Sequence, residues 1–185
     1  MTPCRCLAVL PLLLAASTSR AQDVTSGPEK GGVVPALTVF DATGPQKDKE
    51  VDYAAERGDK PTVYVFIQAD QWDRPMARFL KELDGVTEKE GKDAFVVAVW
   101  LTDDVDKSKQ YLPVAQQSLQ FQAAALTCYP GEKAGPKGWN INGDARATVV
   151  VANRRKVAAA FGYRSINETD VPAVRDALKG ARREK

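Results

Sequence analysis

The sequence predicts an α/β fold, in which helices cover a largely buried sheet. Two segments, 62–67 and 94–101, are apolar and rich in β-branched and aromatic residues, the pattern of strands that are buried on both faces. Between them, apolar side chains recur at the spacing of an amphipathic helix: Met76, Phe79, Leu80 and Leu83. Helices that alternate with continuous apolar strands are typical of the α/β class.

The other elements follow from local patterns. Asp73 is a good N-cap for the helix that carries Met76, and Pro113 should kink or break a helix that runs from 102–104 towards Leu119. The remaining expected elements are a strand at 33–40, a turn at 41–45, a helical turn at 52–57, a strand at 123–128, a loop at 130–138, a hairpin of strands 147–152 and 156–163, and a final helix capped by Thr169 or Asp170.

The composition excludes several kinds of chemistry. The 185 residues are 44% apolar and 27% charged, which indicates a folded domain. The absence of histidine excludes a Ser-His-Asp triad, a Cys-His pair and a histidine-ligated metal. A net charge of +2 gives no electrostatic basis for nucleic-acid binding. We also expect no cofactor and no metal site.

The N-terminus is typical of an exported protein. Arg5, an apolar run at 7–16, and the small residues Ser19 and Ala21 predict a signal peptide over residues 1–21. The alternative is a membrane anchor, but the apolar run is much shorter than the roughly 20 residues that span a bilayer. We therefore expect a secreted or periplasmic protein with no membrane span after cleavage.

Cleavage is expected to leave a flexible segment at 22–32, a domain at 33–179 and a charged tail at 180–185. It also removes two cysteines and two arginines, so that the mature chain has no net charge and Cys128 is its only thiol. One cysteine cannot form a disulfide within the chain.

Four stretches carry a resemblance to a known family. They are 32–41, 64–67, the sequence Trp-Asp-Arg-Pro-Met at 72–76, and 139–143 leading into 147–151. The sequence at 72–76 is similar to the Trp-Cys-Gly-Pro-Cys redox loop of thioredoxins. Taken in order, the stretches resemble the secreted thioredoxin-like and peroxiredoxin-like proteins, from Gly32 to Lys179. The resemblance implies a thioredoxin-like fold with a central mixed sheet, helices on both faces and an edge hairpin.

The chain departs from that family at its redox positions, so the Cys-x-x-Cys motif is lacking. Asp73 and Met76 stand where the family has its two cysteines, and if the alignment slips by two residues Gln71 and Arg74 stand there instead. Thioredoxin chemistry needs a thiolate beside a second thiol. The family's cis-proline is missing too, because residues 145–147 are Ala-Arg-Ala.

These departures favour a non-catalytic binding or interaction module. Its expected contact surface is the former redox loop with one tryptophan from a later loop: Asp70, Gln71, Trp72, Asp73, Arg74, Pro75 and Trp139. The partner is a protein or a small ligand that the sequence does not name. Asp103, Asp104 and Asp106 are expected to cap a helix, because they lack the spacing of a calcium loop. A related possibility is a stable secreted domain whose role depends entirely on its partner.

The alternative from the enzyme class is a thiol-dependent oxidoreductase or peroxidase that uses Cys128. This hypothesis requires that Cys128 be exposed and lie within a few ångströms of the helix that follows the redox loop. The competing interpretation is a small apolar residue at the end of a strand, because a free cysteine usually serves as packing material.

Overall fold

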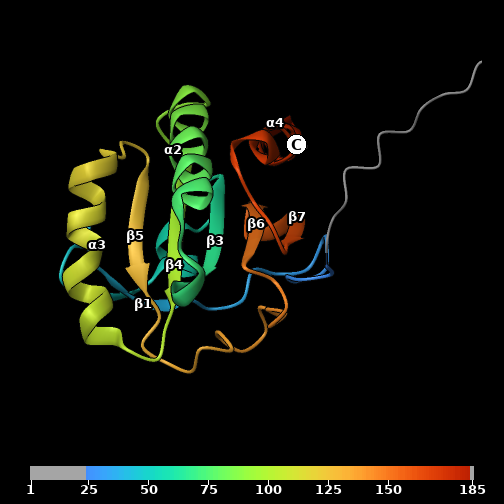
Figure 1. Cartoon of the computed structure of the whole chain (residues 1–185). Helices are drawn as coiled ribbons and strands as arrows, with labels where there is room; N and C mark the ends of the chain where they lie inside the picture. Colours follow the sequence, from blue (N-terminus) through green and yellow to red (C-terminus); the bar gives the residue numbers. More distant parts are fainter. Residues whose placement is uncertain (1–23, 184–185) are drawn as a thin grey trace, which may run out of the picture.

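The computed structural model describes residues 24–183, which form a single mixed sheet of seven strands in the order β2-β1-β5-β4-β3-β6-β7 (Figure 1). The strands are β1 (Thr38–Asp41), β2 (Lys49–Asp52), β3 (Thr62–Gln68), β4 (Phe95–Leu101), β5 (Ala124–Cys128), β6 (Ala147–Asn153) and β7 (Lys156–Tyr163). Strands β3, β4 and β5 are parallel, whereas β6 pairs with β3 in the antiparallel direction and continues into β7 as a hairpin.

Helices lie on both faces of the sheet. They are α1 (Tyr53–Arg57), α2 (Arg74–Lys89), α3 (Val105–Leu119) and α4 (Val171–Arg183), with short 3₁₀ turns η1 (Ala69–Gln71) and η2 (Glu168–Asp170). The three long helices α2, α3 and α4 pack on one face. The short α1 and the segment around Trp139 cover the other. The predicted α/β class, the mixed sheet and the edge hairpin are therefore confirmed.

The central strands owe their position to their sequence. Every residue of β3 is buried, as expected for a continuous apolar segment. Its alternate side chains point to opposite faces, so that Val65 packs under the long helices while Tyr64 packs against Trp139. The predicted inward side of α2 is confirmed, because Met76 and Leu83 are fully buried.

Two local expectations differ from the structure. Strand β2 was not expected; its sequence Lys-Glu-Val-Asp lacks an apolar pattern, and it forms by pairing with β1 at the sheet edge. Pro113 does not break α3, which runs from Val105 to Leu119 with the proline inside. The helix remains whole because it also packs on β5, so tertiary contact outweighs the lost backbone hydrogen bond.

The two terminal segments also differ from expectation. The described part of the expected flexible segment, 24–32, lies against the sheet: Val24 forms a bridge with Gly162, and Ser26 Oγ lies 2.6 Å from Thr148 Oγ1. The expected charged tail instead continues α4 as far as Arg183, because Ala181 is buried on its inner side. The expected signal peptide at 1–21 lies outside the described residues. Between residues 24 and 183, no helix has both the length and the hydropathy of a membrane span.

Candidate functional site

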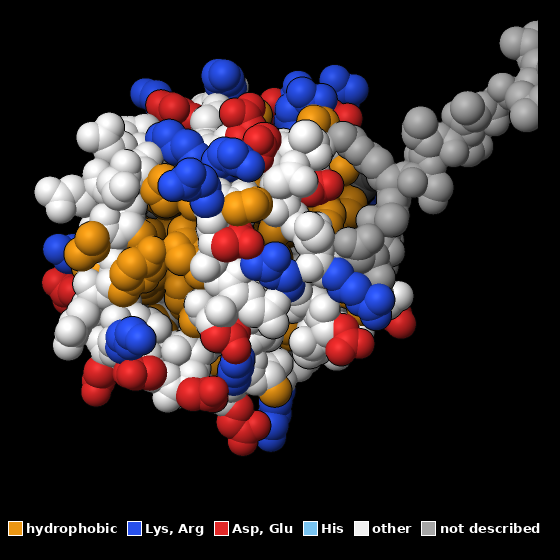
Figure 2. All heavy atoms as spheres, viewed as in Figure 1, with side chains coloured by type: hydrophobic (Ala, Val, Ile, Leu, Met, Phe, Trp, Pro, Cys, Tyr) orange, Lys and Arg blue, Asp and Glu red, His pale blue; other side chains and the backbone are white. Residues whose placement is uncertain are grey.

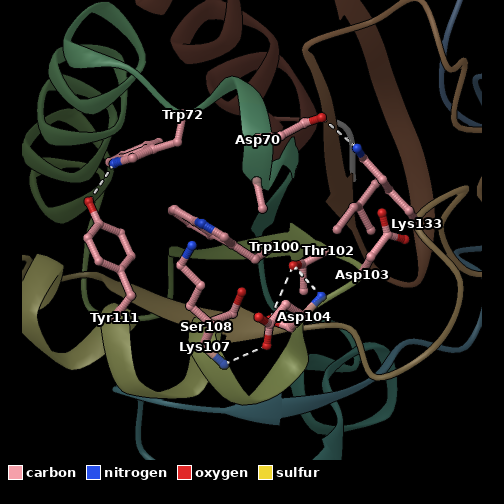
Figure 3. A pocket seen from close by; sticks show the side chains of 12 residues that line it. Asp70, Trp72, Trp100, Thr102, Asp103, Asp104, Lys107, Ser108, Tyr111 and Lys133 are labelled. Atoms are coloured by element: carbon pink, nitrogen blue, oxygen red, sulfur yellow. Dashed lines mark hydrogen bonds and ion pairs between the residues drawn. The ribbon is translucent and has the colours of Figure 1, made fainter.

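A cavity of about 510 Å³ opens at the carboxyl ends of β3 and β4, where open α/β sheets commonly bind ligands. The expected redox loop forms one wall, and the start of α3 forms the opposite wall (Figure 3). Its side chains combine aromatic rings with charges of both signs: Asp70, Trp72, Trp100, Asp103, Asp104, Lys107, Tyr111 and Lys133.

The aromatic wall joins three elements. The rings of Trp72 and Trp100 lie 4.9 Å apart between centroids, at an interplanar angle of 56°. The indole N–H of Trp72 donates a 2.8 Å hydrogen bond to the hydroxyl of Tyr111, which ties the start of α2 to α3 (Figure 3). Trp100 is nearly completely buried, and Tyr111 is 41% exposed. The wall therefore combines a fixed apolar base with an accessible aromatic rim.

The two lysines of the cavity differ in whether their ammonium groups have a partner. Lys133 Nζ donates to Asp70 Oδ2 at 2.6 Å, and this hydrogen bond raises the pKa of Lys133. Asp104 caps α3 by accepting from the Lys107 N–H at 3.0 Å. The side chain of Lys107 extends into the cavity (Figure 3), and no residue between 24 and 183 pairs with its ammonium. Lys107 thus has no charged partner within residues 24–183, and the carboxylates of Asp103 and Asp104 line the same cavity.

A second hollow of about 250 Å³ continues from the cavity between α2 and α3. Trp72 and Tyr111 line both spaces, and Val114 and Leu119 extend the second one along α3. Figure 2 shows hydrophobic side chains gathered between these two helices on this face. We call the cavity and this extension the redox-loop groove. Tyr111 and Val114 are two of the three large hydrophobic residues exposed in the described chain.

Asp73 occupies the start of α2 as an ion-paired cap. Its carboxylate accepts from the Met76 N–H at 3.0 Å, and Arg146 Nη2 donates to it at 2.6 Å. The same guanidinium donates to the Gln71 carbonyl at 2.6 Å. Burial acts to raise the pKa of Asp73, but the hydrogen bonds from Met76 and Arg146 outweigh it and hold the pKa below its ordinary value.

Arg146 lies directly before β6, in the stretch where the resemblance would place a cis-proline. No cis peptide bond occurs in the described residues. The segment reaches α2 through the guanidinium of Arg146, which contacts both Gln71 and Asp73. The positions that resemble a redox pair and its facing proline therefore hold a carboxylate, a buried thioether at Met76, and an arginine.

Cys128 lacks the exposure that the thiol alternative requires. It is fully buried at the end of β5, directly opposite Trp100 in the sheet. Burial raises the pKa of its thiol to about 11, although Lys109 and Ser108 act to lower it. A thiol with this pKa is almost entirely protonated at neutral pH and is a weak nucleophile. The structure therefore agrees with the packing interpretation of this residue.

The structure brings together only part of the expected contact surface. Asp70 and Trp72 line the cavity, whereas Gln71 and Asp73 are engaged by Arg146 and the first turn of α2. Arg74 and Pro75 begin α2 outside the cavity lining. Trp139 was wrongly included: it is fully buried on the opposite face, where its indole donates to the Ala36 carbonyl at 3.0 Å.

Several lining residues were missed by sequence reasoning. Trp100 belongs to a strand with an unbroken apolar pattern, so its sequence indicates only a core residue. Tyr111 follows Asp104 by two helical turns, a spacing that could have placed the two residues on the same face of α3. Among residues 24–183, no group of three acidic or cysteine side chains is arranged to hold a metal ion.

The chain is similar to solved structures, but not to any family model or curated sequence. No family model matches the chain, and no curated protein is significantly similar in sequence. Among solved structures, a DsbF homologue from Corynebacterium diphtheriae superposes with a TM-score of 0.61 at 20% identity, covering 87% of this chain and 96% of that one. BsSco, a Sco-family cytochrome c oxidase assembly protein studied for a disulfide switch, superposes with a TM-score of 0.61 at 12% identity. The match covers 87% of this chain and 100% of that one.

A peroxiredoxin-like protein from Aquifex aeolicus gives a TM-score of 0.57 at 14% identity and covers 85% of this chain and 90% of that one. The chain has a thioredoxin-like fold. This agrees with the fold that the resemblance implied. The names of these neighbours belong to the class of the thiol-dependent alternative, but identities this low establish the fold alone.

Proposed function

We propose that this chain is an exported binding module of the thioredoxin-like fold that holds a partner polypeptide in the redox-loop groove without thiol chemistry of its own. The observation that carries the proposal is the ion pair between Asp73 and Arg146. It occupies the positions where the resemblance would place the redox centre. A carboxylate cannot exchange disulfides, and its partner is fixed by two hydrogen bonds.

The form of the groove supports a polypeptide as the partner. Exposed apolar surface on a folded domain commonly marks a contact site, and here Tyr111 and Val114 stand in a row along α3. Aromatic side chains at such a site supply large contact areas. The ammonium of Lys107 and the carboxylates of Asp103 and Asp104 line one end, which favours a partner segment with charged or polar side chains beside its apolar residues.

The export of this module rests on the sequence of its leader. The apolar run at 7–16 and the small residues at its end support cleavage after Ala21. N-terminal sequencing of the protein recovered outside the cytoplasm should begin at Gln22. Recovery of the uncleaved chain from the cytoplasm would contradict export.

The rival function is the thiol oxidoreductase or peroxidase that the fold neighbours favour as a class. It is tested directly by assays of insulin disulfide reduction and peroxide consumption on the mature wild type and on Cys128→Ala. We expect both proteins to stay at the uncatalysed rate. Activity in the wild type that disappears in Cys128→Ala would establish the rival instead.

The reactivity of Cys128 separates the two functions independently of any substrate. Because its thiol is buried and mostly protonated, an excess of a thiol-alkylating reagent should leave native protein unmodified at neutral pH. The same reagent should modify one site per chain in denaturant. Rapid modification of the native protein, followed by mass spectrometry, would count against the binding module.

The groove itself is tested by capture of partners with the immobilised mature chain. Val114→Ser and Lys107→Gln should each lose the captured protein, because they remove an apolar contact and the free cation of the groove. Val33→Ser is the matched control, since Val33 is also an exposed valine but lies outside the groove. Equal loss in all three variants would contradict a specific groove.

A further inference from the structure

A basic hollow of about 280 Å³ lies at the opposite end of the sheet from the cavity of the redox-loop groove. It forms where the β6–β7 turn, the end of α4 and residues 30–31 meet. Thr62, at the start of β3, pairs with Ala152 near the end of β6, which places the hollow at the amino end of β3. Lys30, Arg154 and Lys156 line it, and none of its lining residues is acidic.

The three cations are not used by the described fold. Within residues 24–183, no hydrogen bond or ion pair engages the side chain of Lys30, Arg154 or Lys156. The other polar groups of the hollow are occupied: the Asn153 amide donates to the Ala181 carbonyl at 2.7 Å, and the Gly31 N–H donates to the Val157 carbonyl at 2.7 Å. The unused donors are therefore all cationic.

Acidic side chains are scarce around this hollow. Asp59 lies beside the turn: its carbonyl accepts from the Arg154 N–H at 3.2 Å, and its exposed carboxylate pairs with the exposed Arg155 at 3.7 Å. Glu29 precedes Lys30 in the sequence but does not line the hollow. A surface with several free cations and no lining carboxylate attracts multivalent anions.

The hairpin turn holds its arginines in an unfavourable backbone conformation. Arg154 and Arg155 have φ angles of 51° and 60°. A two-residue hairpin turn of this kind favours Asn-Gly, because glycine adopts positive φ without a steric penalty. Arg155 still pairs with Asp59, but the side chain of Arg154 has no partner within residues 24–183 that would offset the unfavourable backbone, which indicates a use for its guanidinium outside the fold.

An exposed apolar residue stands beside the same cations. Val33 is 75% exposed and forms a bridge with Lys156. A valine among lysine and arginine side chains fits a surface that carries phosphate groups above an apolar layer. A free phosphate ion has no apolar group that could contact the Val33 side chain.

We propose that this basic hollow and Val33 bind the phosphate groups of an anionic lipid surface. The cations contact the headgroup phosphates, and Val33 contacts the acyl boundary. Because the hollow and the cavity of the redox-loop groove lie at opposite ends of the sheet, a protein bound to lipid keeps that cavity open to a partner. The proposal does not depend on what the groove binds.

The test is co-sedimentation of the mature chain with vesicles of phosphatidylglycerol and phosphatidylcholine, or of phosphatidylcholine alone. We expect binding to the anionic vesicles only, weakened by added salt. Replacing Lys30, Arg154 and Lys156 with glutamine should weaken it roughly a hundredfold, at about fivefold per charge. Arg154→Gly should weaken binding about fivefold without unfolding the chain, because glycine suits the turn.

The matched control removes three exposed lysines elsewhere: Lys47→Gln, Lys49→Gln and Lys137→Gln. Lys49 lies on β2, at the sheet edge farthest from β7. The proposal is overturned if this control loses as much binding, if the chain binds neutral vesicles equally well, or if it binds neither. Binding of inorganic phosphate that depends on Arg154, without vesicle binding, would also overturn it by assigning the hollow to a free anion.

Discussion

At the scale of single residues, Asp73 shows how one side chain serves two partners that differ in their distance along the sequence. Its role as the cap of α2 is local, since the Met76 N–H lies three residues away. Its pairing with Arg146 joins positions 73 residues apart. The first contact follows from the preference of aspartate for helix starts. The second exists only because β6 lies beside β3.

Variants of Asp73 separate these two contacts. Asp73→Ala should lower the free energy of unfolding by about 1–2 kcal/mol, because it removes the cap and the ion pair. Asp73→Asn keeps the cap and loses only the charge, so its cost should be smaller. Urea denaturation of the two variants at neutral pH measures the difference. Equal losses of unfolding free energy in the two variants would assign the whole contribution of Asp73 to its ion pair with Arg146.

The same carboxylate predicts how stability depends on pH. Since the folded-state pKa of Asp73 is below its ordinary value, its contribution is present above about pH 4 and is lost as the pH falls through the folded-state pKa. The stability difference between the wild type and Asp73→Asn should therefore shrink in acid. A difference that stayed constant from neutral to strongly acidic pH would show that this carboxylate is not the titrating group.

At the scale of elements, most boundaries follow from short-range chemistry, and the β6–β7 turn is an exception. Strand β6 is apolar and β-branched, and β7 is mostly alanine and aromatic residues, so the sequence predicts both strands together with the loop between them. The turn residues Arg154 and Arg155 do not predict the tight geometry that the structure contains. Pairing of Asn153 with Lys156 imposes that geometry from outside the turn.

Replacing one of these arginines should therefore stabilise the hairpin. Arg154→Gly is expected to raise the free energy of unfolding by about 1 kcal/mol. At positive φ the Cβ of an L residue crowds the carbonyl oxygen that follows it, and glycine has no Cβ. This gain corresponds to a rise in Tm of about 2–4 °C. Lys137→Gly is the control: Lys137 has no positive φ, so glycine there should leave the Tm unchanged or lower it. A lower Tm for Arg154→Gly would contradict the strain argument.

At the scale of the whole molecule, the N-terminal segment closes the edge of the sheet. Val24 bridges to Gly162, Ser26 bonds to Thr148, and the Gly27 N–H donates to the Asn140 carbonyl at 3.0 Å. Its composition predicts a flexible linker, because Gly, Ser and charged residues dominate it. Backbone pairing with β7 orders it despite that composition.

Gly162→Ala tests this closure. A Cβ at Gly162 would clash with the Val24 carbonyl oxygen, so the backbone of β7 or of the N-terminal segment must move. We expect a loss of roughly 1–3 kcal/mol in unfolding free energy, and faster proteolytic cleavage within 24–32. Gly143→Ala is the matched control, since nothing lies within 4 Å of its added Cβ. Similar losses in both variants would contradict the role of the segment.

The sequence could predict some residues of the candidate site and not others. Asp70 and Trp72 could be placed at the cavity from the sequence, because they follow the carboxyl end of a predicted central strand. Trp100 and Tyr111 could not, since each carries an ordinary core or helix pattern. Trp139 was misplaced because an aromatic residue in a polar loop gives no indication of which way it points.

The sequence by itself determined the strand and helix periods, the cap of α2, and the absence of cysteine from residues 72–76. These features depend on residue type and on neighbours a few positions away. Only the tertiary structure decided that Arg146 pairs with Asp73, that Cys128 is buried, and that Lys30 meets Arg154 across a hollow. Such contacts join segments that become neighbours through strand order, which local patterns do not encode.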